Sequence, residues 1–182
     1  MAHDRIAVLT LAHEKPEYVG ACLDSIMANT PVPLELVLVD NGSGPEIADV
    51  FDRTQSRAGT DGHTVRRLRF EENIGAICGR NEGMKLVESE LVAWIDSDCL
   101  VRSRGWLTAL AGYLDANPDV GIVGPKLVYP WEPHNIQCAG CNITKSGRVV
   151  FRGRGSAIDA PEFAEEHDCP TLISACWLMR TK

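Results

Sequence analysis

The chain has 182 residues, 45% of them hydrophobic and 24% charged, a composition typical of one globular domain with a sizeable core. Its net charge of −7 argues against a nucleic-acid partner, because binding to phosphates needs a basic surface. No apolar run approaches the roughly 20 residues of a membrane-spanning helix, and no secretory leader precedes the first hydrophobic segment. A cytoplasmic protein without a transmembrane segment is expected.

Short hydrophobic runs alternate with helical patterns over the first 125 residues. Strands are expected at residues 6–11, 34–39, 65–70, 91–95 and 120–123, and helices at 16–28, 45–57, 77–87 and 104–116. This alternation predicts an α/β, Rossmann-like fold with a mostly parallel central sheet and helices on both faces. Turn residues become frequent after Pro125, but no linker interrupts the chain, so a single domain is expected.

Loops that carry polar side chains lie at the ends of three of these strands. They comprise Thr10, Ala12, His13 and Glu14 at the end of the first strand, residues 40–43 after the second, and residues 96–98 after the fourth. Ligands of open parallel sheets collect beyond the carboxyl ends of the strands. If the three strands are neighbours, their loops line one crevice.

Asp96 and Asp98 are separated by one residue at the end of a hydrophobic strand. In extended backbone, residues two apart point the same way, so both carboxylates can face one ligand. Hard oxygen donors of this kind suit Mg²⁺ or Mn²⁺ with coordination positions left for diphosphate oxygens. The alternative is that Asp98 caps the next helix and Asp96 is a solvated loop residue.

Two further segments have both a functional and a structural interpretation. Asp40 can accept a hydrogen bond from a nucleobase, or it can serve the turn in which Gly42 takes a positive φ. The glycine-rich residues 73–83 can bring backbone and a helix N-terminus close to an anion, or they can allow tight packing of a helix on the sheet.

The ordered set of segments resembles glycosyltransferase family 2 in order and spacing. The matching segments are residues 10–12, 39–43, 72–75, 80–81 and 95–98. Residues 123–127 and 136–140 look like the rhamnosyltransferase-type branch, which makes bacterial surface polysaccharides. The resemblance covers nearly the whole chain. It implies a GT-A fold and inverting transfer from a nucleoside-diphosphate sugar to a saccharide or lipid-linked acceptor, with Mn²⁺ or Mg²⁺ as cofactor.

The resemblance also assigns roles to individual residues. It implies that a nucleoside-diphosphate sugar is bound by Thr10, Ala12, Glu14, Asp40, Gly75, Arg80, Asn81, Asp96 and Ser97, and the metal by Asp98 with Asp96. Among these, Asp40 would bind the base, and Asp96 would lie near the ribose or the sugar. Arg80 would approach the diphosphate or the donor sugar, although a surface ion pair is equally compatible with its position.

The same resemblance implies a nucleotide-binding core at residues 1–125 and the start of an acceptor-side region at residues 126–182. In the family, a segment similar to residues 174–180 is followed by an acidic motif that supplies the general base. This chain ends at Lys182, so it resembles a C-terminally truncated member with no assigned base. Donor binding with little or no transfer is therefore expected, and peripheral association with a membrane is compatible with the sequence.

Three alternatives stay open at this point. Cys138 and Cys141 have the spacing of zinc ligands, with His134, His167 and Cys169 near in sequence, although buried reduced thiols are the simpler interpretation. A catalytically silent nucleotide-sugar-binding module would share every donor-site residue. A nucleotidyltransferase would share the layout, but its first loop is normally glycine-rich and basic, and residues 10–14 are neither.

Overall fold

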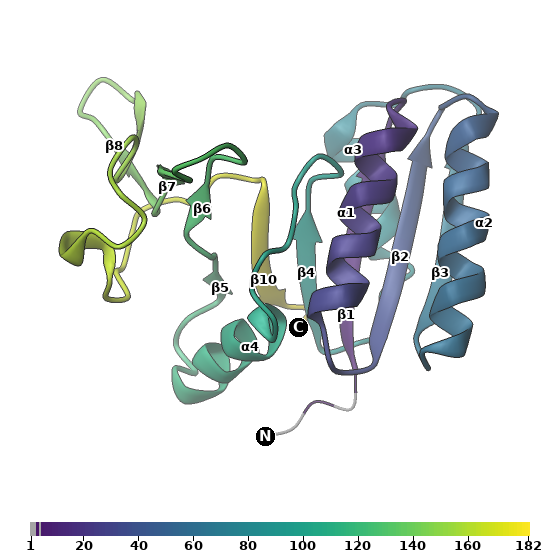
Figure 1. Ribbon diagram of the computed structural model, residues 1–182, viewed down its shortest axis with the longest axis horizontal. Helices are drawn as coiled ribbons and strands as arrows, with labels where there is room; N and C mark the ends of the chain where they lie inside the picture. The colour runs from purple at the N-terminus through teal and green to yellow at the C-terminus, as the bar shows by residue number, and fades with distance from the viewer. Residues whose placement is uncertain (1–2, 4) are drawn as a thin grey trace.

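A six-stranded sheet forms the centre of the computed structural model, which describes residue 3 and residues 5–182 (Figure 1). Its strands are β1 (Ile6–Ala12), β2 (Leu34–Asn41), β3 (Thr64–Phe70), β4 (Leu91–Ile95), β5 (Ile122–Val123) and β10 (Cys176–Arg180). They are ordered β3-β2-β1-β4-β10-β5. The four strands from β3 to β4 are parallel, and β10 is antiparallel to both of its neighbours. The predicted α/β fold with a mostly parallel sheet is confirmed.

Helices cover both faces of this sheet, as the sequence predicts. The helices α1 (Pro16–Asn29), α2 (Pro45–Thr60) and α4 (Trp106–Ala116) share one core with the sheet, and α3 (Ala76–Met84) packs on the other face. Proline occupies the first turn of both α1 and α2, where its missing N–H has no intrahelical partner to lose. Val19, Leu23 and Ile26 then recur at helical spacing and are buried.

Glycines let α3 approach the sheet closely. A Cβ atom on Gly79 would lie 2.4 Å from Leu11 Cδ1, and one on Gly83 would lie 2.7 Å from Val39 Cγ2. These glycines are one helical turn apart, so they form one flat contact face, and the packing interpretation of this segment is correct. The helix ends at Met84 rather than at residue 87, because residues 85–87 bond to carbonyls three residues back.

The strand β10 is the main departure from the expected topology. It returns from the far end of the sequence and inserts between β4 and β5, with Cys176 and Leu178 buried in the larger core. Its few residues carry no pattern that distinguishes a central strand from a loop. Helix α4 also begins later than expected, at Trp106, since Gly105 takes a left-handed conformation with φ 76°.

Between β5 and β10 the chain leaves the sheet and projects to one side (Figure 1). This excursion contains β6 (Leu127–Val128), β7 (Ile136–Cys138), β8 (Cys141–Ile143), β9 (Val149–Phe151) and the short 3₁₀ helix η1 (Pro161–Phe163). It forms two small antiparallel pairs, β6 with β7 and β8 with β9. The expected hairpin turn at residues 146–148 joins β8 to β9.

A buried carboxylate ties the edge of the sheet to the segment before β4. Glu35 accepts hydrogen bonds from Arg66 Nε at 3.0 Å, from the N–H of Glu88 at 3.0 Å, and from the Ser89 hydroxyl at 2.7 Å. Burial alone would raise the pKa of Glu35, but these hydrogen bonds outweigh it and hold the pKa below its usual value. The hydrophobic pattern of residues 34–39 did not predict this buried charge.

Candidate functional site

The three polar loops lie together at one end of the sheet. The strand β1 pairs with β2 on one side and with β4 on the other, so the carboxyl ends of all three are adjacent. The chain runs from β1 outward to β2 and β3, and then returns to the opposite side of β1 as β4. This reversal of strand order is where ligands bind in open α/β sheets. The convergence expected from the sequence is therefore present.

Side chains join the loop after β1 to the loop after β2. The N–H of Glu14 donates to Ser43 Oγ at 3.0 Å, and His13 Nδ1 donates to the Asn41 carbonyl at 3.1 Å. Glu14 and Lys15 both have φ 57°, a conformation that costs a non-glycine residue about 1–3 kcal/mol. The cross-loop hydrogen bonds hold this strained bend in place, directly before α1.

Two asparagines connect the loop after β2 to the start of α3. Asn41 Nδ2 donates to Asn73 Oδ1 at 2.9 Å, and Asn41 Oδ1 accepts the N–H of Ile74 at 3.1 Å. Asn73 Oδ1 also accepts the N–H of Gly75 at 2.8 Å. Sequence reasoning gave neither asparagine a role. The signal was their position beside glycine turns, but their pairing is separated by 32 residues and is not visible in one sequence.

Asp40 is buried inside this junction. Its Oδ1 accepts the N–H of Ser43 at 2.9 Å, and its Oδ2 accepts from Arg69 at 2.8 Å. Arg69 also donates to the Ser43 carbonyl at 3.0 Å, so the turn is braced from β3. Gly42 has φ 75°, as the turn interpretation requires. Contact of Asp40 with a nucleobase stays a prediction.

Arg80 of α3 forms an ion pair with Asp96 at the end of β4. Its guanidinium also lies over the ring of Trp94, 5.5 Å from the centroid. Burial raises the pKa of Asp96, and the Asp98 charge raises it further, whereas Arg80 lowers it. Arg80 therefore places a fixed positive charge beside a partly buried carboxylate, at the point where the strand order of the sheet reverses.

Asp98 is exposed, and within the described part of the chain its carboxylate has no ion-pair or hydrogen-bond partner. It does not cap a helix, because α4 begins eight residues later with Gly105 as its N-cap, so that alternative is wrong. The assumption of extended backbone is also wrong. The N–H of Cys99 donates to the Asp96 carbonyl at 3.0 Å and closes a turn. The two aspartates nonetheless lie near enough for the Asp98 charge to raise the pKa of Asp96.

The remaining predicted residues lie at different depths in the same region. Thr10 and Ala12 are fully buried in β1, Gly75 is the N-cap of α3 with φ 85°, Ser97 is half-buried in the turn, and Asn81 is exposed on α3. The fold therefore brings the loop residues together, while Thr10 lies beneath them. Ligand contacts of this set stay predictions.

The buried Thr10 hydroxyl has no hydrogen-bond partner among the described residues. We expect Thr10→Val to raise the free energy of unfolding by about 1 kcal/mol, because valine keeps the shape and removes an unsatisfied polar atom. Urea denaturation of both proteins measures this change. A loss of stability would show that the hydroxyl has a partner, such as an ordered water, in solution.

Three thiols lie behind the turn at residues 96–99. Cys22 Sγ donates to the Asp96 carbonyl at 3.6 Å, and Cys99 Sγ donates to the Ala175 carbonyl at 3.6 Å. Burial is the main cause that raises the pKa of Cys99 and Cys176 to about 12, and it raises that of Cys22 as well. These cysteines are protonated packing residues, in agreement with the simpler interpretation of the sequence.

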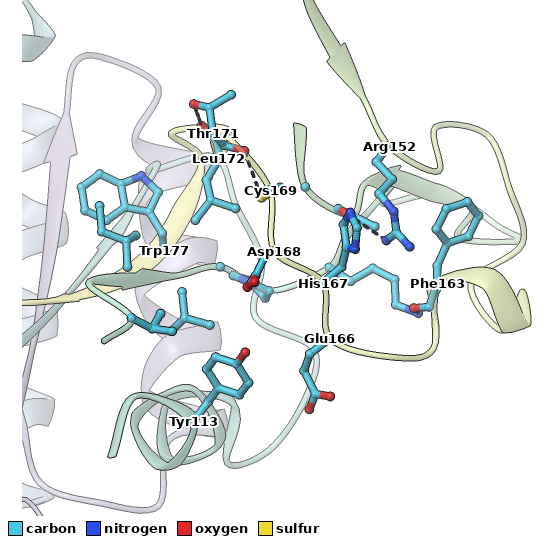
Figure 2. Close-up of a pocket in the computed structure, with 18 of the residues that line it drawn as sticks. Tyr113, Arg152, Phe163, Glu166, His167, Asp168, Cys169, Thr171, Leu172 and Trp177 are labelled. Atoms are coloured by element: carbon cyan, nitrogen blue, oxygen red, sulfur yellow. Dashed lines mark hydrogen bonds between the residues drawn. The ribbon is translucent and has the colours of Figure 1, made fainter. Parts of the chain in front are cut away.

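A cavity of about 800 Å³ opens between α4, β5 and the segment before β10 (Figure 2). Tyr113 and Trp177 lie at one end, Arg152 and Phe163 lie at the other, and Asp168 lies between them. Trp177 stacks on Trp94 with ring centroids 4.7 Å apart. This volume suits a small ligand.

The stacked pair Trp94–Trp177 connects the cavity to the three-loop site. Arg80 lies over Trp94 on one side, and Trp177 lines the cavity on the other. Sequence reasoning missed both tryptophans, because β10 was not expected to pair with β4.

The cysteines of the excursion do not form a complete metal site. Cys138 and Cys141 have their Sγ atoms 3.5 Å apart. No group of three or more His, Cys, Asp or Glu residues in the described chain is arranged to hold a metal ion. The ring nitrogens of His134 contact the Tyr129 carbonyl at 3.0 Å and Glu132 at 3.0 Å instead. These contacts remove His134 from the zinc alternative.

Comparisons with known proteins agree with this geometry. The family model described as Glycosyl transferase family 2 matches residues 7–182. A glucosyl-dolichyl phosphate glucuronosyltransferase of Haloferax volcanii is 32% identical over 126 residues, which are 69% of this chain and 38% of that protein.

Solved structures show the same fold. A mannosyltransferase of Pyrobaculum calidifontis, in complex with GDP-Man and Mn²⁺, superimposes with a TM-score of 0.62 at 23% identity over 69% of this chain and 36% of its own. TarS 1-349 of S. aureus, in complex with UDP, superimposes with a TM-score of 0.63 at 18% identity. The match covers 97% of this chain and 47% of the TarS chain. This chain thus spans less than half the length of each of these relatives.

Proposed function

This chain belongs to glycosyl transferase family 2, and from that membership we propose that it binds a nucleoside-diphosphate sugar as the donor part of a glycosyltransferase. The observation that carries the proposal is that an exposed Asp98, which has no partner among the described residues, lies beside the Arg80–Asp96 ion pair where the strand order of the sheet reverses. A diphosphate needs positive charge and hydrogen-bond donors, and its metal needs free carboxylate oxygens.

The donor set at this point fits a divalent cation. Asp98 and Asp96 would hold Mn²⁺ or Mg²⁺ through hard carboxylate oxygens, and two protein ligands leave positions for phosphate oxygens and water. Such an ion supplies Lewis-acid stabilisation of charge on a departing diphosphate. The Arg80 guanidinium, fixed by Asp96 and Trp94, would hold the diphosphate or the sugar from the opposite side.

The cavity beside Trp177 belongs to the proposed acceptor side, for which residues 126–182 are the expected region. Stacked aromatic rings and carboxylates such as Asp168 are suited to the apolar faces and hydroxyl groups of a saccharide. Inverting transfer, a lipid-linked or saccharide acceptor, and a role in bacterial surface polysaccharide synthesis of the rhamnosyltransferase type are the finer parts of this proposal. The general base is assigned to no residue.

A cytoplasmic location is also part of the proposal. All seven cysteines are free thiols, as expected in a reducing compartment. Among the described helices, none combines the length and the apolar composition needed to cross a bilayer.

Thermal unfolding with UDP, GDP, dTDP or CDP, each with Mn²⁺ or with EDTA, tests this function. We expect one nucleotide to stabilise the protein only with metal. At a concentration a hundredfold above its Kd, the gain is about 2.7 kcal/mol. No stabilisation by any nucleotide would contradict donor binding, and equal stabilisation in EDTA would contradict the metal bridge. Binding without sugar transfer would favour the catalytically silent module.

A further inference from the structure

The hairpin of β8 and β9 exposes aliphatic side chains on both of its faces. Ile143 and Val149 are directly opposite each other across the pair, and Val150 lies on the other face opposite Asn142. The exposed fractions are 50% for Ile143, 48% for Val149 and 44% for Val150. In Figure 1 this hairpin lies at the end of the excursion, far from the central sheet. A projecting apolar hairpin indicates a surface that another phase or molecule covers.

Hydrogen bonds within the turn close the tip of the hairpin. The N–H of Thr144 donates to the Arg148 carbonyl at 2.9 Å, and the N–H of Gly147 donates back to the Thr144 carbonyl at 2.9 Å. The Thr144 hydroxyl accepts the N–H of Arg148 at 3.0 Å and contacts Ser146 Oγ at 2.9 Å. Little conformational entropy remains to be lost when such a turn is immobilised.

The charge of this region is opposite to that of the protein. Residues 133–158 contain four basic residues and no Asp or Glu, whereas the whole chain has a net charge of −7. Lys145 and Arg148 are exposed in the hairpin turn and form no side-chain ion pair within the described chain. Basic residues beside exposed aliphatic ones match an anionic lipid surface, which offers negative headgroups above an apolar layer.

An exposed aromatic residue extends the same surface. Trp131 is 63% exposed and stacks on Tyr129, with ring centroids 4.9 Å apart. The Tyr129 hydroxyl accepts from Arg154 Nε at 3.0 Å, and the Arg154 guanidinium lies over the ring of Phe151 in β9. Trp131 is thus linked to the hairpin through Tyr129 and Arg154, and tryptophan favours the headgroup level of a bilayer.

We propose that Trp131 and the β8–β9 hairpin form a docking surface for an anionic lipid bilayer. Ile143 and Val149, which share one face of the hairpin, enter the boundary of the acyl chains, while Lys145 and Arg148 contact phosphate headgroups. Among the acidic residues of the following segment, Glu166 and Asp168 line the cavity that includes Tyr113 (Figure 2). The proposal does not depend on which nucleotide the protein binds.

Sedimentation of the 182-residue protein with vesicles tests the docking surface. We expect binding to phosphatidylcholine vesicles that contain phosphatidylglycerol, weaker binding at high salt, and none to phosphatidylcholine alone. Lys145→Gln and Arg148→Gln should each weaken partitioning about fivefold. Ile143→Ser should weaken it about tenfold. Each substitution is on an exposed side chain, so the melting temperature should not change.

Matched substitutions elsewhere on the protein test whether vesicle binding depends on this surface or only on overall charge and hydrophobicity. Ile122→Ser changes an isoleucine of β5 that is 48% exposed, and Arg53→Gln changes an exposed arginine of α2. Both variants should bind vesicles like the wild type. The proposal fails if the wild type does not sediment with anionic vesicles, if the control variants lose as much binding as the hairpin variants, or if RNA of equal phosphate concentration is bound more tightly.

Discussion

Replacing Asp98 by asparagine is expected to abolish the metal-dependent part of nucleotide binding and to leave the unliganded protein as stable as the wild type. Asparagine keeps the shape of the side chain but removes the charge that binds a hard cation. The loss in metal affinity should be at least about a hundredfold, the upper range for residues that merely orient a metal ligand. In the unliganded protein, the exposed Asp98 carboxylate has no partner among the described residues, so its removal breaks no contact.

Titration of Mn²⁺ against the nucleotide-induced shift in melting temperature measures this effect. Asp49→Asn is the matched control, because Asp49 is an exposed aspartate of α2 on the same acidic protein. An Asp98→Asn protein that keeps the full Mn²⁺-dependent shift would remove Asp98 from the proposed metal site. A large drop in its stability without ligand would instead assign Asp98 a structural role that its exposed position does not predict.

The parallel half of the sheet could be predicted from the sequence for a simple reason. The strands β1, β2 and β4 are mostly hydrophobic, and each ends in polar turn residues. Strands buried on both faces leave such a pattern, and their loops must then meet at one edge. The positions of Asp40, Asp96 and Asp98 followed from this rule without any knowledge of side-chain contacts.

The contacts inside the site could not be predicted in this way. The Asn41–Asn73 pair, the Arg69 brace on Asp40 and the stack of Trp94 on Trp177 all join residues far apart in the sequence. Each depends on strand register or on the insertion of β10, and a periodic pattern carries no information on either. The turn at residues 96–99 illustrates the same limit, because an Asp-x-Asp pattern does not reveal whether its backbone is extended.

Gly42 sits at the closest approach between two parts of the site, and its substitution is expected to have the largest effect on stability. Its φ is 75°, and a Cβ atom there would lie 2.3 Å from the backbone carbon of Glu72 and 2.6 Å from the nitrogen of Asn73. Backbone atoms cannot move aside as a flexible side chain can. Gly42→Ala must therefore displace residues 72–75 or open the turn after β2.

Gly62→Ala separates this steric contact from backbone strain. Gly62 has nearly the same conformation, φ 77°, but a Cβ atom there meets nothing within 4 Å. We expect Gly62→Ala to cost about 1 kcal/mol from the left-handed conformation alone. Gly42→Ala should cost about 3 kcal/mol or more, because overpacking adds about 1–3 kcal/mol. In a protein of this size, that loss lowers the melting temperature by about 6–12 °C.

Nucleotide binding by the two variants tests whether the turn after β2 holds the start of α3 in place. Gly42→Ala moves Asn73, which holds the N–H of Gly75 at the start of α3, and Arg80 follows one helical turn later. Nucleotide-induced stabilisation should therefore fall in Gly42→Ala and persist in Gly62→Ala, at temperatures where both are folded. Equal costs for the two substitutions would mean that the turn after β2 does not press on residues 72–73. Unchanged nucleotide binding in a destabilised Gly42→Ala would mean that α3 keeps its place without this contact.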